Sequence, residues 1–128
     1  MVFLPENCDF MSLTSKDSNE KCEFLDGELI TSYQKLASEL KIWISLGSFH
    51  RKAEHNGVIK NFNTHVIIDE RGDIKCSTDK LHLFEINLKT ADSVTCLKES
   101  EFVQPGKEFY MPVESPIGLI SPSIVIFY

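Results

Sequence analysis

Apolar and polar residues along the first 50 positions follow the order strand, helix, strand. Residues 2–4 form a short apolar run that predicts a strand, with Glu6 close behind it. Residues 42–49 form a nearly continuous apolar run of β-branched and aromatic side chains, which is typical of a strand buried on both faces. The segment between these two runs carries the strongest periodic signal in the chain.

That periodic segment predicts a helix over residues 27–41. Its apolar side chains recur at helical spacing and fall on one stripe. Asp26 is the expected N-cap, and Glu28 adds negative charge to the first turn. The stripe consists of Leu29, Ile30, Tyr33, Leu36, Ala37 and Leu40.

Together the three elements predict a βαβ unit. Such a crossover makes its two strands parallel, and their carboxyl ends open on the same edge of one sheet. A lone Glu is most often an ordinary surface charge. Glu6, however, is expected at the edge where open α/β sheets build their sites, which favours a functional role.

The middle of the chain predicts two polar loops and a β-hairpin. Residues 11–23 and 50–60 are polar, and the second segment contains the turn-forming pair Asn56-Gly57. Residues 62–69 and 74–78 resemble strands and flank a glycine-containing turn. We therefore expect these two segments to pair as a hairpin.

Lys80 lies just past that hairpin, so an ammonium group stands at a strand end as the carboxylate of Glu6 does. Residues 81–87 are expected to be extended, and residues 88–106 irregular and polar. Prolines interrupt the rest of the chain. The strand candidates there are residues 109–111, 113–115 and 124–128.

Length and composition restrict the class of protein. The 128 residues suit one domain, and a hydrophobic content of 42% with a charged content of 25% is ordinary for a globular protein. A net charge of −6 without any Lys/Arg run argues against nucleic acid. The apolar runs are too short to span a bilayer. We expect a cytoplasmic protein, or a mitochondrial one if the true N-terminus lies upstream.

The cysteines and histidines predict neither a metal site nor a disulfide framework, because they lack ligand or framework spacing. No Gly-x-Ser-x-Gly elbow is present. Cys8 follows Glu6 by two residues, but no neighbouring His or cation would activate it, so a structural thiol is expected. The residues weighed are Cys8, Cys22, Cys76, Cys96, His50, His55, His65 and His82.

Six pieces of the chain, taken in order, resemble the N-terminal half of a nitrilase-superfamily carbon–nitrogen hydrolase. Their order is far more specific than any one of them. The resemblance is greatest to the branch that contains the deaminated glutathione amidases and the Nit–Fhit fusion proteins. The pieces are Phe3-Leu4-Pro5-Glu6, residues 41–50, residues 63–69, Lys80-Leu81-His82-Leu83-Phe84, Glu99-Ser100 and Ser115-Pro116-Ile117-Gly118.

The resemblance implies an α/β fold, a partial α-β-β-α sandwich incomplete at both ends, and amidase chemistry by a Glu-Lys-Cys triad. In that family a thiolate attacks the amide carbonyl, a Glu transfers protons and a Lys stabilises the oxyanion. Here Glu6 would be the general base and Lys80 the oxyanion stabiliser. The implied substrate is a small carboxylate-bearing amide such as deaminated glutathione, with no cofactor or metal.

The nucleophile position falls on Val125 when the chain is aligned without a gap from Pro116-Ile117-Gly118. The resemblance fades from residue 119, so residues 1–128 are treated as one partial domain with a divergent tail at 119–128. The family's second half and an additional active-site Glu would lie beyond the chain. A truncated, inactive form is therefore expected.

Two other interpretations stay open. A non-catalytic pseudoenzyme or interaction module would pair with a full-length homologue, or with its own copies, through an apolar sheet face and unpaired strand edges. Residues 123–128 are a segment of that kind. A free-standing α/β binding domain would explain the composition but not the ordered motifs.

Overall fold

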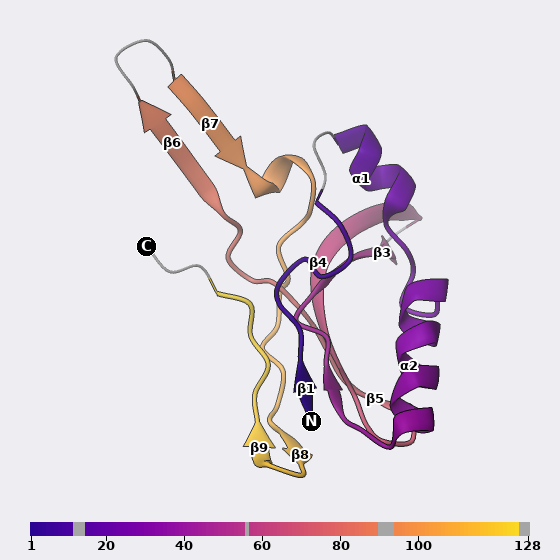
Figure 1. Cartoon of the computed structure of the whole chain (residues 1–128). Helices are drawn as coiled ribbons and strands as arrows, with labels where there is room; N and C mark the ends of the chain where they lie inside the picture. The colour runs from indigo at the N-terminus through magenta and orange to yellow at the C-terminus, as the bar shows by residue number, and fades with distance from the viewer. Residues whose placement is uncertain (12–14, 56, 90–93, 126–128) are drawn as a thin grey trace.

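A computed structural model describes residues 1–11, 15–55, 57–89 and 94–125. It contains a five-stranded sheet, covered on one face by a helix, and two smaller hairpins (Figure 1). The elements are β1 Val2–Phe3, α1 Ser15–Lys21, α2 Glu28–Leu40, β2 Ile44–Ser45, β3 Phe49–His55, β4 Val58–Ile68, β5 Ile74–Asp79, β6 Glu85–Lys89, β7 Val94–Lys98, the 3₁₀ turn η1 Glu99–Glu101, β8 Val113–Ser115 and β9 Gly118–Ile120.

The long strand β4 organises the sheet. Its first half pairs antiparallel with β3, and its last residues pair with β2 on one edge and β5 on the other. The strand β1 adds to β2 in parallel, with Val2 opposite Ile44 and Phe3 opposite Ser45. The predicted βαβ unit and the predicted hairpin before Lys80 are both confirmed.

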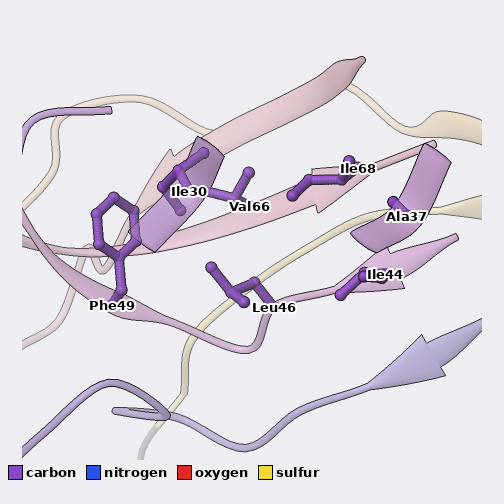
Figure 2. Close-up of a cluster of buried hydrophobic side chains, with 7 residues drawn as sticks. All are labelled: Ile30, Ala37, Ile44, Leu46, Phe49, Val66 and Ile68. Atoms are coloured by element: carbon purple, nitrogen blue, oxygen red, sulfur yellow. The ribbon is translucent and has the colours of Figure 1, made fainter. Parts of the chain in front are cut away.

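The helix α2 covers the sheet with part of its predicted apolar stripe, whereas Leu36 and Leu40 of that stripe are exposed. Ile30 and Ala37 are fully buried and face Val66 and Ile68 of β4 (Figure 2). Apolar burial of this kind supplies most of the stability of a short helix. The cluster drawn in Figure 2, which we call the helix-covered core, consists of Ile30, Ala37, Ile44, Leu46, Phe49, Val66 and Ile68.

The predicted start of α2 is wrong in one detail. Gly27, and not Asp26, occupies the N-cap, and it makes no side-chain capping bond. Instead the Glu23 carboxylate accepts a hydrogen bond from the backbone N–H of Leu29 at 2.9 Å. A carboxylate from the preceding loop therefore satisfies one of the donors that a capping side chain would have taken.

The predicted strand over residues 42–49 is shorter than expected, although most of its residues are buried. Only Ile44 and Ser45 form β2, because Gly47 adopts the left-handed region at a φ of 75° and turns the chain. A Cβ at Gly47 would collide with the carbonyl groups of Leu4 and Pro5, so only glycine allows this close approach.

Both predicted polar loops contain regular structure. Part of residues 11–23 forms α1, and residues 50–60 contain most of β3 and the start of β4. Polar sequence misled the prediction because β3 satisfies its charges by pairing: the Arg51 guanidinium binds the Asp79 carboxylate at 3.0 Å. Gly57 does turn between β3 and β4, whereas Asn56 lies outside the described residues.

Beyond Lys80 the predictions are mixed. The supposedly irregular residues 88–106 include β7 and η1, and β6 pairs with β7 in a hairpin that extends away from the sheet (Figure 1). Residues 113–115 form β8 as expected, but residues 109–111 are not a strand. Of the last candidate, residues 124 and 125 are not a strand, and residues 126–128 lie outside the described chain. Neither described helix could cross a membrane.

Candidate active site

Glu6 is presented by a tight turn directly after β1. Its neighbour Asn7 takes a left-handed backbone conformation at a φ of 54°, which Asn tolerates better than most residues. The Asn7 N–H donates to the Ser48 hydroxyl at 2.8 Å. With Gly47 packed against the chain just before it, this turn fixes the direction in which the Glu6 carboxylate leaves the backbone.

Lys80 leaves the end of β5 beside the same sheet edge. Its N–H donates to the Asn63 carbonyl at 2.8 Å, and its carbonyl accepts from the N–H of Gly106 at 2.8 Å. The side chain is only 3% exposed. A lysine with so little access to water requires charged or polar partners.

Those partners are two carboxylates. The Lys80 ammonium lies 2.6 Å from Oε1 of Glu6 and 2.9 Å from Oε2 of Glu99. Burial lowers the pKa of Lys80, but the hydrogen bonds and charges of Glu6 and Glu99 outweigh it and raise the pKa above its ordinary value. The lysine is therefore a fixed cation. Two strand-end residues 74 positions apart in sequence meet as an ion pair.

Asn63 of β4 joins the two carboxylates. Its Nδ2 donates to Oε1 of Glu6 at 2.8 Å and to Oε1 of Glu99 at 3.0 Å. Glu99 is further held by the backbone N–H of Phe84 at 2.7 Å. We name Glu6, Asn63, Lys80 and Glu99 the carboxylate–lysine cluster.

Sequence reasoning missed Asn63 and Glu99 as members of this site. Both stand in pieces that carry the family resemblance, which was the available signal, but neither has a distinctive spacing. Glu99 places a second carboxylate of the cluster within this chain. The β6–β7 hairpin returns the backbone to Phe84, and Glu99 follows directly.

Three of the four members of the cluster line a pocket of about 420 Å³. Glu6, Lys80 and Glu99 contribute its charged wall, and Val125 lines the same pocket with 53% of its surface exposed. All three residues singled out from the sequence, Glu6, Lys80 and Val125, therefore share one cavity.

A second cavity of about 450 Å³ opens beside Arg51 and Asp79. It is slightly larger, but its Arg51–Asp79 pair is already matched: Arg51 binds both oxygens of Asp79 at 3.0 Å, and the Thr64 hydroxyl donates to the same carboxylate at 2.6 Å. The smaller pocket is chemically richer because it holds two carboxylates around one ammonium.

Cys8 lies near Glu6 in sequence but has a different environment. Its Sγ donates to the carbonyls of Leu46 and Ser48 at 3.1 and 3.2 Å. Burial and the neighbouring Asp9 charge raise the pKa of the Cys8 thiol, which disfavours the thiolate that a nucleophile needs. Among the described residues, no group of three His, Cys, Asp or Glu side chains is arranged to hold a metal ion.

Comparison with known proteins gives the family. Residues 1–126 match the carbon-nitrogen hydrolase family. The chain is 40% identical over 124 residues to the nitrilase and fragile histidine triad fusion protein NitFhit of Drosophila melanogaster, and 32% identical over 125 residues to the deaminated glutathione amidase of Rattus norvegicus. Each match covers 97% of this chain, which spans 25% and 37% of the two relatives.

Solved structures give the same fold. The crystal structure of the C. elegans NitFhit protein superposes with a TM-score of 0.77 and 36% identity, over 96% of this chain and 29% of that one. Saccharomyces cerevisiae Nit3, a member of the nitrilase superfamily, superposes with a TM-score of 0.68 at 21% identity, over 94% of this chain and 40% of that one, and supports the fold alone. The predicted partial α/β nitrilase fold is confirmed, and the chain belongs to the carbon–nitrogen hydrolase family.

Proposed function

We propose that this chain carries the Glu–Lys part of an amidase site for a small carboxylate-bearing amide, and that Val125 stands where the nucleophile would be. The observation that carries the proposal is the shared pocket of Glu6, Lys80 and Val125. The 2.6 Å contact between Glu6 and Lys80 supports a base and an electrophilic group acting on one substrate.

Glu6 is suited to act as the general base. Its contacts with Lys80 and Asn63 both fall on Oε1, which leaves Oε2 for a proton donor. The side chain is 37% exposed and therefore open to the pocket. In the amidase reaction it would take a proton from the attacking thiol and return it to the leaving amine.

Lys80 is suited to stabilise the oxyanion. An ammonium has three donors, and Glu6 and Glu99 engage two of them, so the third can face the negative oxygen of a tetrahedral intermediate. Because the ammonium is buried and held on two sides, little reorganisation accompanies the reaction. Such a donor typically contributes about 3 kcal/mol of transition-state stabilisation.

The covalent step needs a group that Val125 does not have. A thiolate would attack the amide carbonyl carbon, the carbon–nitrogen bond would break with release of the amine, and water would hydrolyse the resulting thioester. The methyl groups of valine form no such bond. We therefore expect the chain to bind an amide without turning it over by this route.

Deaminated glutathione is the substrate of choice for a test, because it is named in the rat relative and carries carboxylates beside its amide bond. Purified chain incubated with it is expected to release no more product than a buffer control. The matched variant Lys80→Met should behave identically. Turnover by the unmodified chain that Lys80→Met abolishes would overturn the proposed inactivity.

A second candidate function is an interaction module of the same family. The exposed apolar side chains of Phe109, Met111 and Leu119, at 85%, 78% and 71%, favour it, since large apolar groups in one segment often mark a protein contact. Light scattering of the chain alone and mixed with the rat amidase tests this function. A discrete complex supports the module, and separate species of unchanged mass contradict it.

A further inference from the structure

Behind the carboxylate–lysine cluster lies a buried pair, Asp9 and His50, that the proposed chemistry does not use. The Asp9 carboxylate lies 3.1 Å from Nδ1 of His50 and also accepts the His50 backbone N–H at 2.7 Å. The Phe10 ring stacks on the imidazole at a centroid distance of 4.4 Å. With 8% exposure, the imidazole is held in one orientation by a charge and an aromatic face.

His50 borders two cavities. His50 lines the pocket of Glu6 and Lys80, and it also lines a smaller cavity of about 160 Å³ together with Asp9. Asp9 lines only the smaller one. Because Asp9 engages Nδ1, Nε2 is the ring nitrogen left to meet a ligand in the larger pocket.

A carboxylate-bearing substrate needs a hydrogen-bond donor or a cation away from the reacting centre. Lys80 is already shared by Glu6 and Glu99, so the cluster as a whole carries one excess negative charge when both carboxylates are ionised. It would repel a second carboxylate. The remaining basic groups on the pocket wall are His50 and the exposed Lys98.

Of the two, His50 is the better-organised partner. Lys98 is an exposed side chain, and exposed ion pairs contribute little. His50 is buried, and the Asp9 carboxylate holds its imidazole at Nδ1. Burial alone would raise the pKa of the Asp9 carboxyl, but hydrogen bonds and charge from His50 outweigh it and lower that pKa, so the aspartate stays ionised.

Resting on the proposed function, we propose that His50, positioned by Asp9, is the specificity-determining residue that binds the free carboxylate of the amide substrate. Its Nε2–H would donate to that carboxylate while the amide end lies against the Glu6–Lys80 pair. The other charged groups near the ring are Lys21, which lies over the Phe10 face, and Glu23, which lines the smaller cavity.

Binding of two small probes to the unmodified chain tests this role without any hydrolysis. Glutaramate has an amide at one end and a carboxylate at the other, and glutardiamide replaces the carboxylate with a neutral amide. Dissociation constants are measured by NMR titration. We expect glutaramate to bind about ten-fold more tightly, as a charge-assisted hydrogen bond would give, and to shift the ¹⁵N signal of His50 Nε2.

Variants test whether the preference for glutaramate over glutardiamide depends on His50. His50→Gln should bring the two probes to nearly equal affinity, and Asp9→Asn should weaken the preference several-fold while keeping the ring. Lys98→Gln and His82→Gln are matched controls and should retain it, because His82 lies outside the pocket lining and Lys98 is exposed. A purely structural role for His50 would not change the ratio of the two affinities.

The proposal is overturned if the unmodified chain binds both probes equally or binds neither. It is also overturned if the preference for glutaramate survives in His50→Gln or is lost in Lys98→Gln. If His50→Gln does not fold, the ring signal of the unmodified chain decides, and an Nε2 resonance unmoved by glutaramate rejects the role. The same NMR spectra would show glutarate if glutaramate were hydrolysed. Such turnover would contradict the proposed inactivity, whereas the role of His50 is decided by the ratio of the two affinities and by its loss in His50→Gln.

Discussion

The helix-covered core and the outer arm, which we define as the described residues 85–89 and 94–125, are built on different principles. Every side chain of the core cluster is at most 2% exposed. In the arm, Phe109, Ile117 and Leu119 are between 61% and 85% exposed. The core cluster is buried, whereas the arm leaves much of its apolar surface to water.

The carboxylate–lysine cluster lies at the junction of these two regions. Glu6, Asn63 and Lys80 come from the sheet side, and Glu99 comes from the arm. The arm is pinned near the cluster by the buried Val103 and by the hydrogen bond from the Gln104 N–H to the Asn61 carbonyl at 2.8 Å. A rigid sheet therefore fixes the base and the cation, while the arm supplies the second carboxylate and Val125.

The largest expected effect is a difference in the free energy of unfolding between a core variant and an arm variant. Phe49→Ala removes a fully buried ring and should lower the free energy of unfolding by about 3–5 kcal/mol. Phe109→Ala, the matched change at an 85% exposed ring, should alter it by less than about 0.5 kcal/mol. Urea denaturation followed by circular dichroism measures both, and equal losses would contradict the distinction.

Lys80→Met tests the junction itself. It leaves two carboxylates facing each other around a buried methyl group, and removing one partner of a buried ion pair costs about 3 kcal/mol. Lys75→Met, an exposed residue of β5, is the control and should be nearly neutral. If the Lys80 variant unfolds at the same urea concentration as the control, the cluster does not hold the two regions together.

Acid should weaken the sheet through His65. Burial lowers the pKa of His65 from 6.5 to about 4, so the unfolded chain binds a proton between these values while the folded chain does not. Stability therefore falls as pH drops from about 6.5 to about 4. Allowing for partial access of water, the loss is roughly 2 kcal/mol.

The control for that slope is His65→Gln, which keeps a hydrogen-bonding group near Ser45, where the imidazole now lies 2.9 Å from the hydroxyl. Urea midpoints at several pH values should lose the His65 contribution in this variant. Carboxylates with a lowered pKa, such as Asp9 and Asp69, reduce stability only below about pH 4. Their contribution can therefore be separated from that of His65. A slope unchanged by His65→Gln would reject the assignment.

The smallest expected effect is a difference in the rates at which the cysteines are alkylated, which involves no change in stability. Cys96 lies exposed in the arm, whereas Cys22 and Cys76 are buried and burial raises the pKa of both, to about 11 for Cys76. Native alkylation with iodoacetamide, followed by peptide mass spectrometry, should label Cys96 first. Labelling of Cys76 at a similar rate would show that the sheet opens as readily as the arm.

Elements with a local burial pattern could be predicted from the sequence, and elements that depend on distant contacts could not. The stripe of α2 and the hairpin of β4 and β5 were predictable because their burial patterns are local. The helix α1 was missed because Ser15–Lys21 is polar throughout and shows no apolar stripe. Strand β3 was missed because its sequence is polar and the partner of its Arg51, Asp79, lies 28 positions away in sequence.

The site was predictable in part for the same reason. Glu6 and Lys80 follow recognisable strands, so each could be placed at a sheet edge. Asn63, Glu99 and the Asp9–His50 pair depend on tertiary contacts between segments 36 to 57 positions apart, for which a single sequence holds no local pattern.

The most direct measurement is the intact mass of a Val125→Cys variant after incubation with deaminated glutathione and an acid quench. If Glu6, Lys80 and residue 125 form one site, we predict a mass increase equal to the acyl group in a thioester. The same treatment of the double variant Val125→Cys with Lys80→Met should give no adduct. An adduct that forms equally without Lys80, or no adduct with Lys80 present, would contradict the shared site.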